Sequence, residues 1–227
     1  MPDQDDEVPA WQRKTEGESR IGATLAVLTI VGVQVAPLKA LRQQPVWLLP
    51  ALEILLLAGL VVANPYRLNR EEPWLRRGGL LLTGLLSLAT AIAAGRLVFE
   101  LTHESIDNPA ELLASGGAVW LTNVVVFGLW YWEFDRGGPA ARAHARKPLP
   151  DFLFVQMQSP ELAEKEWEPQ FFDYLYLSFT NATAFSPTDV MPMSRWAKAM
   201  MMVQSAISLV LVILVIARAI NILQPVS

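Results

Sequence analysis

A few polar side chains interrupt the long apolar stretches of this sequence, and they are the first residues to consider for chemistry. Glu53 lies about seven residues into one stretch, Arg96 about five residues before the end of another, and Asn123 about eight residues into a third. Gln34 lies three residues before Pro37. At a helical rise of about 1.5 Å per residue, antiparallel helices would place these four side chains at a similar depth. Because unpaired ionisable groups are costly in a membrane, we predict that the four form an intramembrane polar cluster.

Two interpretations of this cluster remain open. It could line a polar pocket or a path for ions or protons, as charged residues inside membrane spans often do. Alternatively, an ion pair between Glu53 and Arg96 fixes how two helices dock. Ser87, Ala91 and Gly95 recur every four residues in the same apolar stretch as Arg96, a spacing typical of close helix packing.

A second group of polar residues follows a short aromatic stretch near the end of the chain. The stretch FFDYLYLSFTNATAFSP, residues 171–187, is apolar for about 13 residues and then becomes polar. A transmembrane helix needs roughly 20 apolar residues. The shorter length therefore favours a half-membrane, re-entrant or interfacial segment.

Several classes of site are excluded by composition or by missing motifs. The sequence has no cysteine, which removes disulfides, thiolate metal sites and cysteine nucleophiles. Its two histidines, His103 and His144, lie far apart near loop residues, so we expect neither a metal nor another cofactor. The glycine-rich phosphate loop, HExxH and GxSxG patterns are all missing. We therefore do not expect an enzyme, and we expect no nucleic acid among the partners.

Long apolar helices must position the polar residues. Of the 227 residues, 52% are hydrophobic and only 18% are charged, against about a quarter in a typical soluble domain. The charges lie between long uncharged stretches, which predicts an all-α, polytopic transmembrane helical bundle. Five spans are expected, at about Ile21–Ala36, Val46–Asn64, Gly78–Leu101, Ser115–Trp132 and Ala197–Leu223. The segment 171–187 adds a half-length element to them.

The remaining segments complete the predicted organisation. Residues 1–20 are polar and begin with clustered acidic side chains, so we expect a disordered cytoplasmic tail. Residues 21–132 would form a four-helix transmembrane bundle. Residues 133–170 are polar and proline-rich, which predicts a connecting loop or a small membrane-surface structure. Residues 171–227 would contain the half-length segment and the last transmembrane helix.

The distribution of lysine and arginine predicts the orientation in the membrane. With a cytoplasmic N-terminus and residues 171–190 not crossing, fourteen of these residues lie on the cytoplasmic side and three on the other. If residues 171–190 do cross, the counts become thirteen and four. Both alternatives predict a multi-pass protein of the cell inner (plasma) membrane, with the N-terminus and residues 133–170 in the cytoplasm.

The end of the sequence resembles the pore module of two-transmembrane potassium channels, in which a pore helix, a selectivity filter and an inner helix follow one another. Here FFDYLYLSFTNAT leads into AFSPTD, then into VMPMSRWAKA and a long apolar helix. Seven residues fall in register with the family's pattern: Ser178, Phe179, Thr180, Thr183, Asp189, Pro192 and Ser194. The pore-loop candidates that this resemblance implies are Thr180, Asn181, Thr183, Ser186, Thr188 and Asp189.

The filter itself departs from the channel family. Where the family has V-G-Y-G, this sequence has Phe185, Ser186, Pro187 and Thr188. Potassium filters align backbone carbonyls by means of glycines at unusual dihedral angles, whereas proline fixes its own φ and restricts the residue before it. A potassium-selective filter is therefore disfavoured. The same C-terminal block is also similar to a family of uncharacterised bacterial multi-spanning membrane proteins, which brings no established activity.

Two functions remain open. The first is a non-conducting scaffold or accessory protein that kept the pore module's fold and lost its filter, which Pro187 and the missing glycines favour. The alternative is an oligomeric ion channel or permeation protein, tetrameric if it is channel-like, with monovalent cations as its permeating ions. Asp189 and the lack of basic residues between Phe171 and Ser194 favour cations. In both cases the lipid bilayer is the expected surrounding.

Overall fold

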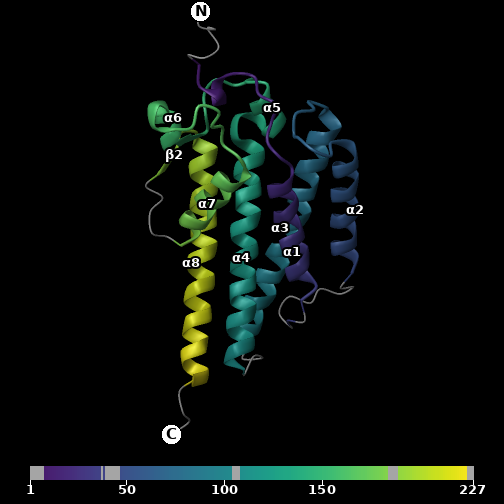
Figure 1. Ribbon diagram of the computed structural model, residues 1–227. Coiled ribbons are helices and arrows are strands. Elements are labelled where there is room, and N and C mark those ends of the chain that lie inside the picture. Colours follow the sequence, from purple (N-terminus) through teal and green to yellow (C-terminus); the bar gives the residue numbers. More distant parts are fainter. Residues whose placement is uncertain (1–7, 37, 39–46, 104–107, 184–188, 224–227) are drawn as a thin grey trace, which may run out of the picture.

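The computed structural model describes residues 8–36, 38, 47–103, 108–183 and 189–223, and within them the chain is mostly helical (Figure 1). Its α-helices are α1 (Ile21–Gln34), α2 (Leu48–Ala63), α3 (Pro73–Thr102), α4 (Pro109–Phe134), α5 (Pro139–Ala143), α6 (Val155–Gln158), α7 (Phe171–Ala182) and α8 (Arg195–Leu223). Two short strands, β1 (Phe152–Phe154) and β2 (Val190–Pro192), form one small antiparallel sheet. The predicted helical fold is confirmed for these residues, and the sheet is an addition that the sequence did not predict.

Three of the helices are long and apolar enough to cross a membrane, namely α3, α4 and α8. They contain 30, 26 and 29 residues. At about 1.5 Å per residue, each exceeds the roughly 30 Å hydrocarbon core. The other two expected spans are helical as well, but α1 and α2 contain only 14 and 16 residues. These helices are those of a multi-pass membrane protein, with three candidate spans and two shorter apolar helices.

Prolines and polar caps explain where these helices begin. α3 starts at Pro73 and α4 at Pro109, first-turn positions where an N–H would have no helical partner. The Asn108 side chain accepts a 2.9 Å hydrogen bond from the backbone N–H two residues later. α7 opens with a reciprocal capping box between Gln170 and Asp173. Local sequence therefore sets the start of each of these three helices.

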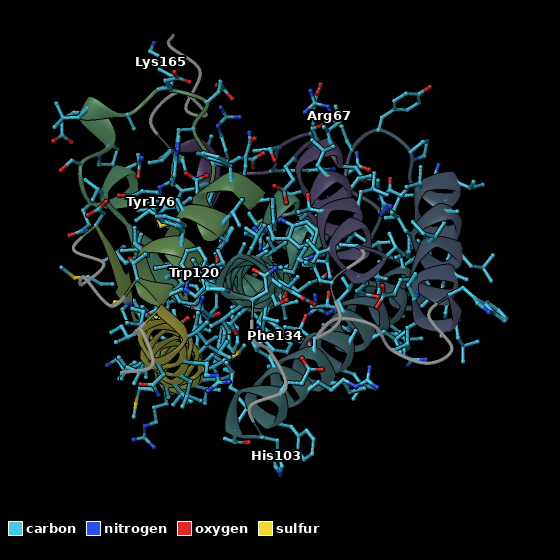
Figure 2. All side chains as sticks on the ribbon, turned by 90° about the horizontal axis from the view of Figure 1, so that it is seen from below. Arg67, His103, Trp120, Phe134, Lys165 and Tyr176 are labelled. Carbon is cyan, nitrogen blue, oxygen red and sulfur yellow. The ribbon has the colours of Figure 1, made fainter. Side chains whose placement is uncertain are left out.

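α4 lies at the centre of the bundle, with α1, α3, α7 and α8 around it and α2 at the edge (Figure 2). Within its most apolar stretch, 61% of α4 is buried inside the chain, against 28% for α8. Side chains such as Leu209, Ile213 and Ile216 of α8 are accordingly exposed. The surface of α8 is therefore apolar and open to lipid or to another chain.

The packing face of α3 differs from the predicted stripe of small residues. Ala89, Ala93 and Leu97 are buried, whereas Ala91 and Gly95 are exposed. A Cβ added at Gly95 would meet open space. The predicted packing stripe is therefore wrong for Ala91 and Gly95, because the neighbouring stripe carries leucines and buries more apolar area. Ser87 does face α4, where its hydroxyl accepts a 2.8 Å hydrogen bond from the Trp130 indole.

A layer of short elements covers the end of the bundle that carries the N-terminus, as Figure 1 shows. We call residues 8–20, 64–72, 135–170 and 189–194 the polar layer. The prediction of a disordered tail is wrong for residues 8–20: Trp11 and Glu18 are buried, and Thr15 N–H donates to the Ala143 carbonyl at 2.9 Å. Residues 1–7 lie outside the described residues. The sequence did not reveal this packing because most of the partners come from residues 133–170, for which a connecting loop or a small membrane-surface structure was expected.

Residues 135–170 form a folded part of the polar layer, so of the two alternatives predicted for residues 133–170 the open loop is wrong and a small folded structure is present. They contain β1, α5 and α6, and Asp135, Arg136 and Arg142 are buried within them. Asp135, Arg136 and Gly137 form a 3-10 turn in which Arg136 has a φ of 52°. Polar composition is thus no guide to exposure here, because the buried charges find hydrogen-bond partners inside the layer.

α7 leaves the polar layer, and the chain after it returns to the same layer. Phe171 N–H, at its start, donates to Glu18 at 2.8 Å. Beyond it, Val190 of β2 lies opposite Phe154 of β1. With 12 residues, α7 is about 18 Å long and occupies the half of the bundle next to the polar layer (Figure 1). The start of α7 and strand β2 therefore lie at the same end of the bundle.

Candidate functional site

The inner face of α7 carries a polar network against α4 and α8. Gln204 of α8 is fully buried at its centre. The amide Nε2 of Gln204 donates to the carbonyl of Ser178 at 2.9 Å and contacts its hydroxyl at 2.7 Å. The amide Oε1 accepts from the Tyr131 hydroxyl of α4 at 2.6 Å and from the Asn181 amide at 2.8 Å. One side chain therefore ties three helices together.

The other polar atoms of this network are also satisfied within the chain. Asn181 Nδ2 donates to the Met201 carbonyl at 3.0 Å, and Asn181 Oδ1 accepts from the Ser205 hydroxyl at 3.2 Å. The Ser178 hydroxyl donates to the Val124 carbonyl of α4 at 2.6 Å. Buried polar groups that are matched in this way stabilise one arrangement of the helices. This face of α7 is therefore a packing surface.

The pore-loop candidates within α7 and at its end make local contacts. Asn181 belongs to the network just described. The Thr180 hydroxyl donates to the carbonyls of Tyr176 and Leu177, and the Thr183 hydroxyl donates to the carbonyl of Thr180 at 2.9 Å. Threonine commonly satisfies its hydroxyl on its own helix in this way. All three polar side chains are thus bonded inside their own chain.

The outward face of α7 is aromatic. Phe172, Tyr176 and Phe179 are exposed along it at helical spacing. The Tyr176 hydroxyl donates to the Asp189 carboxylate at 2.7 Å, which connects this face to the start of β2. The remaining two candidates, Ser186 and Thr188, lie outside the described residues.

Buried charges of the polar layer hold the start of α7. The Glu18 carboxylate accepts hydrogen bonds from Phe171 N–H at 2.8 Å, from the Trp132 indole and from the Arg142 guanidinium at 3.3 Å. Burial raises the pKa of Glu18 to about 7, while the nearby Arg142 acts in the opposite direction. This carboxyl group therefore joins the N-terminal segment, α4, α5 and α7.

Arg142 and Asp135 complete the group of buried charges that holds the start of α7. Arg142 Nη1 donates to the Trp132 carbonyl at 2.6 Å and to the Asp135 carbonyl at 3.1 Å. Its guanidinium lies over the Tyr174 ring, 5.0 Å from the centroid. The Asp135 carboxylate accepts from the Tyr174 hydroxyl at 2.6 Å and from Asp151 N–H at 2.8 Å. α7 is thus fixed at its start by charge-assisted contacts and along its length by neutral hydrogen bonds.

The predicted intramembrane cluster does not form one site. The Gln34 amide donates to both carboxylate oxygens of Glu53, at 3.2 and 2.9 Å, and this pair joins α1 to α2. Asn123 donates instead to the Ser208 hydroxyl of α8 at 3.0 Å. Arg96 is exposed on α3 and does not pair with Glu53. The predicted ion pair is wrong because the packing face of α3 leaves Arg96 on the outward side.

The residues that organise the site were mostly missed in the sequence. They are Glu18, Tyr131, Asp135, Arg142 and Gln204. A signal existed for Gln204, which is an amide within the apolar stretch of the last helix, as Asn123 is in the fourth. The three charged residues lie in segments whose composition predicts exposure, so their burial could be found only from the fold.

The arrangement offers buried hydrogen bonds and no obvious reaction centre. Within the part of the chain that the structure describes, no group of three or more His, Asp or Glu side chains could hold a metal ion. No protein-family model, curated protein or solved structure matches this chain. The function must therefore be argued from the geometry.

Proposed function

We propose that this chain is a non-conducting, multi-pass membrane protein that acts as a scaffold or accessory subunit. The network centred on Gln204 carries the proposal. It bonds Ser178 and Asn181 of α7 to α4 and α8 of the same chain. A conducting pore needs polar groups that face the permeating ion, whereas these groups are used for docking.

The proposed topology has five passes and one re-entrant helix. α3, α4 and α8 supply three passes, and the shorter α1 and α2 supply two more by local thinning of the bilayer or by tilting of their neighbours. The polar layer and the N-terminus then lie in the cytoplasm beside the inner (plasma) membrane. Strand β2 lies in the polar layer, as the start of α7 does, which favours the topology in which residues 171–190 do not cross the membrane. In that topology fourteen lysine and arginine residues lie on the cytoplasmic side and three on the other side.

Ion flux through reconstituted vesicles tests the proposal. We expect the wild-type protein to give no potassium or sodium flux above that of protein-free vesicles, and Thr183→Ala and Asp189→Ala to give none either. Thr102→Ala, at the exposed end of α3, is the matched control for the threonine change. A cation-selective flux that Thr183→Ala or Asp189→Ala abolishes, and that Thr102→Ala leaves unchanged, would overturn the proposal.

The second candidate is an oligomeric protein that lets monovalent cations pass. The observation in its favour is the outward face of α7, where Phe172, Tyr176 and Phe179 are exposed next to Asp189. A second copy could cover this face and bring the acidic side chains together. The mass of the purified protein in detergent separates the candidates: a tetramer with cation flux supports this second one, and a monomer without flux contradicts it.

A further inference from the structure

A cavity of about 340 Å³ lies among α1, α2, α3 and α4, just below the polar layer. Its volume falls in the range of roughly 300–1,000 Å³ that small-molecule sites occupy. Apolar side chains form its deep wall: Val27, Leu57, Leu60, Leu82 and Leu129. Polar and charged side chains from the ends of the same helices line its mouth. The cavity is therefore amphipathic along the bundle axis.

Helix geometry gives the depth of the two zones. Arg20 stands at the start of α1 and Val27 about two turns further in, which is about 10 Å along the axis. α2 runs in the opposite direction to α1. Its later residue, Asn64, therefore lies at the mouth, and its earlier residue, Leu57, lies in the deep wall. A molecule that fits has a polar head and an apolar chain that reaches at least that depth.

Two acids of the mouth are already matched by arginines. Glu71 accepts hydrogen bonds from Arg146 at 2.7–3.2 Å. Arg76 donates to the carbonyls of Glu133 and Gly137 and lies 3.9 Å from the Glu133 carboxylate. The third acid of the mouth, Glu72, is exposed at its rim. The buried negative charge of the mouth is therefore compensated.

Arg20 lacks such a contact, although the Glu133 carboxylate acts on it electrostatically from a longer distance. The Nε atom of Arg20 is buried and has no hydrogen bond, and among the described residues no carboxylate lies within 4 Å of its guanidinium. Asn64 is only 6% exposed and lines the same cavity. Buried polar groups of this kind are normally satisfied. Arg20 and Asn64 both line the cavity mouth, so a ligand there would supply the acceptor that the Arg20 Nε atom lacks.

We propose that this cavity binds an anionic amphiphile, with its phosphate or carboxylate head at Arg20 and Asn64 and its acyl chain against Val27, Leu57 and Leu82. Arginine forms strong charge-assisted hydrogen bonds with such oxyanions. A cationic head would instead meet Arg20 and Arg76. The proposal is independent of whether the chain conducts ions.

Binding to purified full-length protein in an uncharged detergent tests this site. Dodecyl phosphate is the probe, and dodecyltrimethylammonium is the amphiphile of the same chain length and opposite charge. We expect dodecyl phosphate to raise the thermal unfolding midpoint by several degrees through mass action, and the cationic amphiphile to have no such effect. Arg20→Gln should weaken binding of the anionic probe about ten-fold or more, because a charge-assisted hydrogen bond is lost.

Two further variants keep the test decisive. Thr24→Phe places a ring in the cavity without changing charge and should abolish binding, whereas Arg77→Gln, one residue from Arg76 but outside the cavity, should not change it. Equal effects of both amphiphiles, or full binding by Thr24→Phe, would overturn the proposal. Native mass spectrometry with phosphatidylglycerol and with laurate distinguishes a bilayer lipid from a free fatty acid, and retention of either one, lost in Thr24→Phe, supports the site.

Discussion

At the scale of single residues, the charges buried in the polar layer are the most demanding feature of the molecule. Glu18, Asp135 and Arg142 are all less than a tenth exposed, yet each has several hydrogen-bond partners. Removing one partner from such a group leaves another charge buried and unpaired, which costs roughly 3–5 kcal/mol. These residues therefore specify one arrangement of the polar layer around the start of α7.

The first prediction concerns the pH dependence of Glu18. Burial raises its pKa from 4.5 to about 7, outweighing Arg142, while the Glu168 carboxylate raises it further. Between those values the folded chain holds a proton that the unfolded chain has released. The unfolding free energy should therefore fall as pH rises from about 4.5 to about 7, by about 3 kcal/mol from this group, at about 1.36 kcal/mol per pKa unit.

Thermal unfolding in detergent across this pH range measures the effect. Glu18→Gln cannot titrate, so the difference in unfolding midpoint between wild type and this variant should change over pH 4.5–7 and stay constant above it. Glu16→Gln alters an exposed carboxylate two residues away and should keep the wild-type profile. Parallel pH profiles for wild type and Glu18→Gln would show that Glu18 does not titrate as expected.

At the scale of elements, α7 is a short helix that depends on its neighbours. A helix of 12 residues is only marginally stable alone, so its hydrogen bonds to α4 and α8 and its buried aromatic residues must hold it. Phe171, Tyr174, Leu177 and Ser178 are buried at helical spacing, while the opposite side is exposed. The element is therefore docked through one face, and Gln204 is the main polar contact on that face.

The second prediction tests this docking. Gln204→Leu removes the partner of the Tyr131 hydroxyl, the Asn181 amide and the Ser178 carbonyl. Each buried group left unsatisfied costs about 1–3 kcal/mol in proteins, with membrane values towards the lower end. We expect a lower unfolding midpoint and a selective loss of hydrogen-exchange protection in residues 171–182. Gln158→Leu makes the same change at an exposed position of α6, and an equal loss there would contradict the prediction.

The elements also show how far the sequence could lead. The apolar stretches predicted the end of each long helix to within two residues, because apolar length is a local property. The starts of α3 and α4 were placed five and six residues too late, because charged residues lie in the first turns that follow Pro73 and Pro109. The half-length element at residues 171–182 was equally accessible, since its apolar run is short. The pairing of polar side chains could not be predicted from the sequence. Gln34 meets Glu53 and Asn123 meets Ser208 only because each helix has a particular rotation about its own axis. That rotation depends on packing and not on the position of one charge.

At the scale of the whole molecule, the bundle has two unlike ends. One end carries the polar layer, which contains the N-terminal segment, the link from α2 to α3, the chain before α7 and strand β2 after it. α8 starts at this end and leads away from it (Figure 1). Trp196, at the start of α8, donates to the Asp151 carboxylate at 2.8 Å and so fastens the last helix to this end. The other end consists of helix termini, such as that of α3 at Thr102.

The third prediction assigns these ends to the two sides of the membrane. Single cysteines can be introduced directly, because the chain has none. Cysteines at the exposed positions Asn69, Lys165 and Met193 should react with an impermeant maleimide only when the cytoplasmic face is open, and one at His103 only from the opposite face. Met193 is decisive. If it reacted from the side of His103, segment 171–194 would cross the membrane, and the closed network around Gln204 could not exist as described.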